Sequence, residues 1–183
     1  MTFDSFLGAI VAAQADDRVG YAHALQEIQA GRKHKHWIWY VFPVLKGVRK
    51  TSRPQYEIQS LECAQAWLRH QLLGPRLVEI TTAAVTQLEA GADASQLFGS
   101  SVDAVKFHNC MTLFAVAAAP QSSEAVALFQ RGLQALGQQP AQLTIEILSK
   151  AAAACQRRAD IPRRHLEDIG ARDSDGEDED SDE

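Results

Sequence analysis

One stretch of the chain combines cationic and aromatic side chains in a pattern that suits anion recognition. It reads GRKHKHWIWYVFP over residues 31–43. From residue 29 to residue 55 the chain has no acid, and an uncompensated positive run of this kind attracts anions. Arginine offers a planar fork for phosphate or carboxylate, lysine a point charge, and tryptophan and tyrosine faces for stacking. The seven bases of the run are Arg32, Lys33, Lys35, Lys46, Arg49, Lys50 and Arg53.

We therefore predict that residues 32–56, called here the basic-aromatic segment, engage an anionic small molecule, phosphate- or nucleotide-like, or an acidic protein partner. Lys106 and Asn109 lie one turn apart and interrupt a later apolar stripe, so Lys106 is expected to extend an anion-binding pocket beside this segment. A structural role is the alternative: Trp37 can belong to the core, and Lys33 can face the end of a preceding helix. The predicted ligand contacts are Arg32, Lys33, His36, Trp37, Trp39, Tyr56 and Lys106.

Catalysis has one candidate residue. His36 is the best general acid or base, because histidine titrates near neutral pH. The chain has no G-x-S-x-G elbow and no glycine-rich phosphate loop, and His108 and Cys110 stand two positions apart, which is too close on a helix for a nucleophile and its base. Three functions stay open: an anion-binding domain, an enzyme acting on such a molecule through His36, and a protein-interaction module without a small ligand.

Four residues have the chemistry of zinc ligands, in the pairs His34-x-His36 and His108-x-Cys110. An H-x-H pair shares one face on a strand, whereas on a helix the two side chains point about 200° apart. We therefore expect no metal site and no cofactor. Sequence-specific DNA binding is not expected either, because no helix-turn-helix, finger or zipper pattern occurs.

The elements that must position these residues read as helices. Apolar residues recur at helical spacing, which predicts one all-α domain of about seven or eight helices. The N-terminus lacks a basic region and carries Asp4, so it is read as an amphipathic helix of the mature protein and not as a signal peptide. The stretch WIWYVF, residues 37–42, is the only strand candidate. A helix is favoured, because Trp37, Val41 and either Val44 or Leu45 keep helical spacing, with Pro43 limiting its length. The predicted helix starts are Ser60, Pro75, Ser122 or Ser123, and Pro140.

The charge distribution divides the chain into three parts. A helical globular domain is predicted over residues 1–156, a charged extension over 157–172, and an acidic tail over 173–183. The tail holds eight of the 23 acids and no base, so it is expected to be disordered and is hypothesised to cover the basic-aromatic segment transiently. The three cysteines are odd in number and widely spaced, which favours reduced thiols and a cytoplasmic location. No apolar run approaches the roughly 20 residues of a membrane span.

Three segments resemble a known family. They are AGRKHKHWIWYVFPVLKG (30–47), YEIQSLECAQAWLRHQLLGPRL (56–77) and LFGSSVDAVKFHNCMTLFAVAA (97–118). They resemble the family of domains of unknown function numbered 1810, over about residues 3–150. The resemblance implies a compact all-α domain, and it implies no particular activity.

Overall fold

The computed structural model of the chain describes residues 3–159, and this part is helical apart from its loops. The predicted all-α class is confirmed, with nine α-helices over the described range instead of seven or eight. The charged extension from residue 160 and the acidic tail lie outside the described residues, as does the hypothesised cover by the tail. The helices are α1 (Phe3–Gln14), α2 (Tyr21–Gln29), α3 (Ile38–Val41), α4 (Leu61–Arg69), α5 (Leu73–Glu89), α6 (Ala94–Leu97), α7 (Ser101–Ala118), α8 (Ser123–Ala135) and α9 (Gln142–Ala159), with a short 3₁₀ helix η1 (Pro54–Tyr56) between α3 and α4.

The chain divides after Ser149 into two units. The first unit holds α1 to α8 and the start of α9, and it contains every residue of the basic-aromatic segment. The described part of the second unit, residues 150–159, continues α9. The site described below belongs to the first unit alone.

Serine side chains begin three of the helices as N-caps. Ser60 Oγ accepts a hydrogen bond from the Cys63 N–H at 3.3 Å, which confirms the predicted start of α4. Ser122 Oγ accepts from the Ala125 N–H at 3.2 Å and starts α8 in the same way. The cap of α7 is Ser100, whose side chain accepts from the Asp103 N–H. Each cap satisfies a backbone donor that a helix leaves open at its first turn.

The start of α5 differs from the prediction. The helix begins at Leu73 and not at Pro75. The reason is His70, whose Nδ1 accepts from the N–H groups of Leu72 and Leu73 at 3.1 and 3.3 Å. An imidazole nitrogen here satisfies the open backbone donors, a role usually taken by Ser, Thr, Asp or Asn. The predicted proline therefore lies inside the first turn, where a missing N–H costs little. Likewise, α9 begins at Gln142 and not at Pro140.

The helix predicted to follow Trp37 is short. Only α3, Ile38–Val41, is helical: it ends before Pro43, the residue expected to limit it, and the expected continuation to Val44 or Leu45 is wrong. Leu45 instead pairs with Ile58 in an isolated parallel bridge, with the Ile58 N–H donating to Val44 O at 2.9 Å. The bridge closes the intervening residues into a loop that returns to α3. This return brings Arg53 and Tyr56 of η1 next to Trp39.

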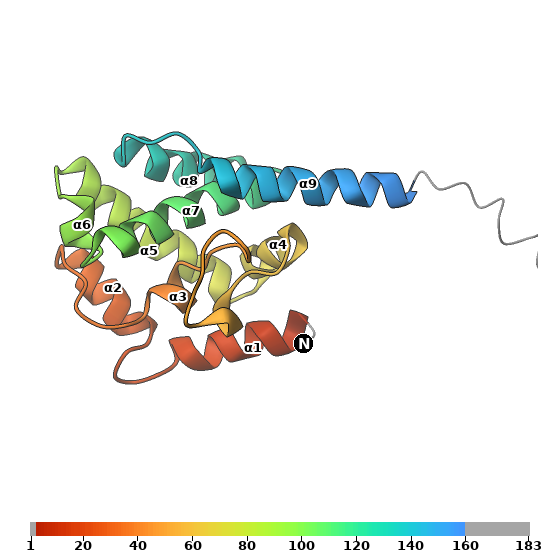
Figure 1. The fold of residues 1–183 in the computed structure, drawn as a ribbon. Helices are drawn as coiled ribbons and strands as arrows, with labels where there is room; N and C mark the ends of the chain where they lie inside the picture. Colours follow the sequence, from red (N-terminus) through yellow and green to blue (C-terminus); the bar gives the residue numbers. More distant parts are fainter. Residues whose placement is uncertain (1–2, 160–183) are drawn as a thin grey trace, which may run out of the picture. The chain divides into compact units, whose positions relative to one another are not determined.

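An aromatic cluster ties the basic-aromatic segment to the central helix α7, which contacts α4, α6 and α8 (Figure 1). Phe42 meets Phe107 of α7 edge to face at 5.0 Å between ring centroids. Phe107 also stacks on Phe98 at 4.6 Å, and Phe42 lies 6.3 Å from Trp37. All four rings are fully buried. The cluster fixes α3 against α7 and so sets where Trp39 and Lys106 lie.

The three cysteines are free thiols, as predicted. Cys63 and Cys110 are buried, and burial raises the pKa of both thiols, so neither is an activated nucleophile.

None of the helices within the described range has the length and apolar character that a membrane crossing requires.

Candidate functional site

The loop between α2 and α3 is held by one carboxylate. Glu27 Oε2 accepts hydrogen bonds from the backbone N–H groups of His34 at 2.8 Å and Lys35 at 3.1 Å. It also accepts from Trp37 Nε1 at 2.8 Å. Hydrogen bonds to a charged acceptor are among the stronger ones in proteins. Glu27, the last acid before the acid-free run, therefore holds residues 34–37 to α2, and Trp37 is a buried structural residue.

This clamp makes stability depend on pH. Partial burial raises the pKa of Glu27, but the hydrogen bonds from His34, Trp37 and Lys35 outweigh it and leave the pKa below its usual value of 4.5. A lowered pKa in the folded state adds stability that is present above pH 4.5 and is lost as pH falls through the folded-state value. We expect Glu27→Gln to cost about 1–3 kcal/mol at pH 7 and less at pH 3, measured by urea unfolding. The control, Asp17→Asn, alters an exposed carboxylate, and a cost of Glu27→Gln that stays constant with pH would contradict the assignment.

Two lysines share a second carboxylate. Lys33 Nζ lies 2.7 Å from Asp103 Oδ2, and Lys106 Nζ lies 2.8 Å from Asp103 Oδ1. Side-chain exposure is 8% for Lys33 and 13% for the other two residues, so the cluster is largely shielded from water. Burial raises the pKa of Asp103, but the hydrogen bonds from Lys106 and Lys33 lower it by more, so the pKa of Asp103 lies below its usual value. At neutral pH the two ammonium groups thus face one carboxylate, and the cluster keeps one positive charge in excess.

Lys106 connects this cluster to Trp39. Its Nζ lies 4.5 Å from the centroid of the Trp39 ring, and the Arg53 guanidinium lies 5.8 Å from the same ring. Both distances fall within the range of cation–π attraction. Trp39 is partly exposed, in contrast to Trp37 and Trp67, which are fully buried. The side chains of α3, α7 and the returning loop therefore converge on one ring.

A small pocket surrounds that ring, called here the Trp39 pocket. Its free volume is about 10 Å³, room for about one water molecule. A larger ligand requires a side chain to move, and Arg53 is the mobile candidate because it is exposed and has no acidic partner among the described residues. Its lining residues are Trp39, Phe42, Val44, Thr51, Arg53, Tyr56, Glu57 and Lys106.

The loop that carries Arg53 has a hydrogen bond before η1 and an aromatic contact at the end of η1. The Arg53 N–H donates to Thr51 Oγ1 at 3.0 Å, which folds a turn just before η1. Tyr56 at the end of η1 meets Tyr40 edge to face, with 5.4 Å between ring centroids. The Tyr40 hydroxyl donates in turn to Val19 O at 2.8 Å. The backbone is thus fixed while the Arg53 side chain stays in solvent.

The structure brings together three of the seven predicted contacts and separates the others. Trp39, Tyr56 and Lys106 line the pocket, and Lys33 reaches it only through Asp103. The remaining three predicted contacts, Arg32, His36 and Trp37, do not line it. Arg32 and His36 are exposed, with the His36 ring 6.4 Å from the Trp39 ring, and Trp37 is buried.

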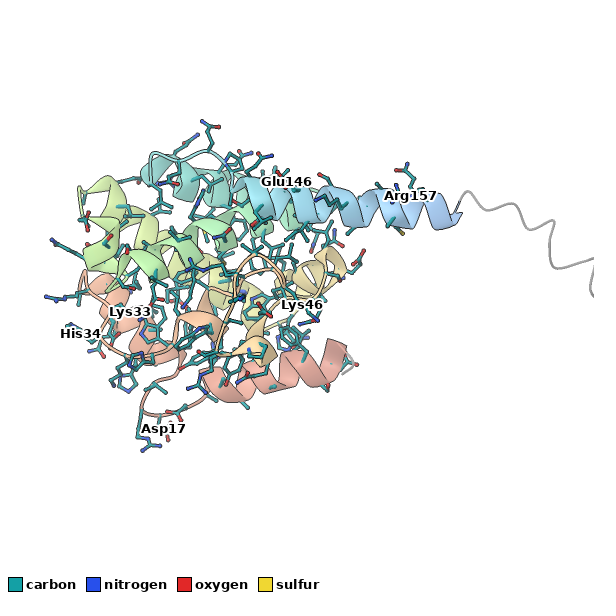
Figure 2. All side chains as sticks on the ribbon, in the orientation of Figure 1. Asp17, Lys33, His34, Lys46, Glu146 and Arg157 are labelled. Atoms are coloured by element: carbon teal, nitrogen blue, oxygen red, sulfur yellow. The ribbon has the colours of Figure 1, made fainter. Side chains whose placement is uncertain are left out.

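The bases of the segment do not form one patch. Figure 2 shows Lys33 and His34 on the same side of the molecule, with Lys46 well apart from them. Two charged residues of the pocket lining, Arg53 and Glu57, were absent from the predicted contacts. The available signal for them was the end of the acid-free run: Arg53 is its last base and Glu57 the acid that follows it.

The residues with zinc chemistry serve other purposes. His108 Nε2 lies 2.7 Å from the backbone oxygen of Gln139, and Cys110 is fully buried. His34 and His36 are both exposed. Within residues 3–159, no three His, Cys, Asp or Glu side chains come together in a group able to hold a metal ion.

Fold and pocket together define an all-α domain with a small pocket of cationic and aromatic side chains. The chain belongs to the family described as "Protein of unknown function (DUF1810)", whose model matches residues 5–148, as the resemblance predicted. It is similar in structure to the conserved hypothetical protein Rv1873 from Mycobacterium tuberculosis, with 37% sequence identity and a TM-score of 0.68. That match covers 78% of this chain and 96% of the other. No curated protein shows a significant match to the chain.

Proposed function

We propose that the chain is a binding domain for a small anion of the phosphate type, held in the Trp39 pocket by Arg53 and Lys106. The observation that carries this proposal is the excess of positive charge around one partly exposed tryptophan. Lys33 and Lys106 share Asp103, while Arg53 has no acidic partner among the described residues. The shielded cluster of Lys33, Lys106 and Asp103 has one positive charge in excess, which favours the arrival of an anion because low dielectric strengthens the attraction.

The way an anion enters follows from the size of the pocket. With room for about one water molecule, the pocket does not admit a nucleotide while Arg53 lies over Trp39. The Arg53 side chain is exposed, so it can leave the ring and form a bidentate contact with a phosphate at the pocket mouth. Lys106 supplies the second contact, since its ammonium group has donors beyond the one given to Asp103. The freed face of Trp39 is then open to a flat group of the ligand.

Binding of pyrophosphate, followed by isothermal titration calorimetry, tests this proposal. We expect Arg53→Ala to weaken binding about tenfold, the usual scale for a lost hydrogen bond to a charged group. The matched control is Lys50→Ala, which removes the same charge from an exposed residue of the same loop that does not line the pocket. Affinity should also fall as salt rises.

Two results would reject the pocket as the binding site. Equal weakening by Arg53→Ala and Lys50→Ala would mean that the anion senses only the general charge of the segment. Absence of pyrophosphate binding to the unmodified chain at low salt would remove the proposal altogether. Catalysis by His36 is not part of the proposal, because His36 is exposed and lies outside the pocket lining.

A further inference from the structure

The Trp39 pocket also contains an acid that the proposed anion does not use. Glu57 lines the pocket and is only 7% exposed. Across residues 3–159 the structure records no hydrogen bond and no ion pair for its carboxylate; its backbone oxygen accepts from Gln59 Nε2 at 2.8 Å. Buried carboxylates are normally paired, because an unpaired charge loses its hydration without compensation. Glu57 therefore has no partner within the described part of the protein, although its carboxylate oxygens are not fully enclosed and keep some contact with solvent.

The charged and titratable groups near Glu57 do not supply that partner. Lys46 acts on it only through space, without the contact of an ion pair, and is itself exposed. Arg53 and Lys106 line the same pocket but lie over Trp39, and Lys106 is paired with Asp103. Tyr56 is the remaining titratable group of the lining.

The pKa of Glu57 is shifted in the direction expected for a carboxylate without a cationic partner. Burial raises the pKa of Glu57 above its usual value, and the charge of Lys46 opposes that shift without cancelling it. An arriving cationic group would stabilise the charged form and lower the pKa again. A raised pKa in a pocket is a common feature of groups that meet a ligand.

We infer that Glu57 receives an ammonium group of the ligand, so that the ligand is a small zwitterion with its anion at Arg53 and Lys106. This inference rests on the proposed function, since the same pocket must hold the anion. The lining suits such a molecule: it offers cations, a carboxylate without a partner, and the rings of Trp39 and Tyr56, which themselves attract ammonium groups. An aminoalkyl phosphate is the simplest compound of this class.

Two probes that differ only in the ammonium group test the inference. Ethyl phosphate carries the anion alone, whereas 2-aminoethyl phosphate carries both charges. We expect the full chain to bind 2-aminoethyl phosphate about tenfold more tightly than ethyl phosphate in calorimetric titration. Glu57→Gln should bind the two probes equally, and it should fold well because the Glu57 carboxylate makes no hydrogen bond or ion pair within the described residues that the change would break. Glu124→Gln, which alters an exposed acid outside the pocket, should keep the tenfold preference.

The pH dependence gives a second readout. The preference for the aminoalkyl probe should disappear as pH falls through the pKa of Glu57, and ethyl phosphate corrects for titration of the phosphate itself, whose second pKa is about 6. Equal binding of both probes by the unmodified chain, weakened by Arg53→Ala, would overturn the inference and leave the anion site standing. A preference that survives in Glu57→Gln would overturn it as well. Failure of both probes to bind would overturn the inference together with the proposed function.

Discussion

Trp37→Ala is expected to lower the free energy of unfolding by about 3–5 kcal/mol, measured by urea denaturation at pH 7. Trp37 is fully buried beside Phe42, and its indole N–H is one of the three donors to Glu27. Removing it leaves a cavity in the aromatic cluster and loosens the loop that positions Lys33. The change is predicted to act on stability and not on a ligand, because Trp37 does not line the Trp39 pocket.

Two further variants separate the causes. Trp37→Phe keeps most of the packing but loses the hydrogen bond to Glu27, and should cost about 1–1.5 kcal/mol beyond the loss of ring volume. Trp39→Ala is the matched control, because this tryptophan is partly exposed, and it should cost clearly less than Trp37→Ala. An unchanged unfolding midpoint for Trp37→Ala would contradict the structural role assigned to this residue.

Asp103→Ala is expected to cost about 3–5 kcal/mol, because it strands two shielded ammonium groups without a counterion. Lys33 and Lys106 have side-chain exposures of only 8% and 13%, so water does not replace the lost carboxylate. Adding Lys33→Met to Asp103→Ala removes one of the stranded charges and should restore part of the stability. Thermal or urea unfolding of the single and double variants measures both effects.

A double variant that is no more stable than Asp103→Ala would contradict the pairing of Lys33 with Asp103. If the double variant is less stable than Asp103→Ala by the full cost of losing Lys33 alone, the two residues do not interact. The matched surface pair is Arg131 and Glu89, whose side chains are 53% and 45% exposed. Glu89→Ala should cost at most about 1 kcal/mol, as is usual for exposed ion pairs.

Much of the fold was predictable because its signals are local. The Ser60 and Ser122 caps follow from residue type and from the apolar stripe that begins after each. The start of α5 was missed because a histidine nitrogen caps it, and sequence patterns do not distinguish such a histidine from any other. The length of α3 was missed because Leu45 pairs with Ile58, a contact between residues 13 positions apart that helical spacing does not reveal.

The candidate site was predictable only in part, and for the same reason. The acid-free run indicated which segment supplies Arg53, and the position of Lys106 in an apolar stripe indicated that its side chain has a specific neighbour. Which bases lie together depends on Glu27 and Asp103. Glu27 binds Trp37, and Asp103 binds Lys33, a residue distant from it in the sequence. Glu57 was not among the predicted contacts, because its burial in the pocket arises only when the loop returns to α3.

The central claim, that a phosphate-type anion binds beside Trp39, is tested most directly by iodide quenching of tryptophan fluorescence. The chain has three tryptophans, and Trp37 and Trp67 are fully buried, so Trp39 provides the quenchable emission. Acrylamide, which is neutral, reports exposure alone and serves as the reference. Ionic strength is held constant with chloride throughout, so that general screening does not change.

We expect iodide to quench Trp39 more strongly, relative to acrylamide, than it quenches free N-acetyltryptophanamide. Pyrophosphate should remove this excess in the unmodified chain and in Lys50→Ala, while Arg53→Ala should show little excess to remove. Quenching by iodide that matches the free compound and does not respond to pyrophosphate would contradict an anion site beside Trp39.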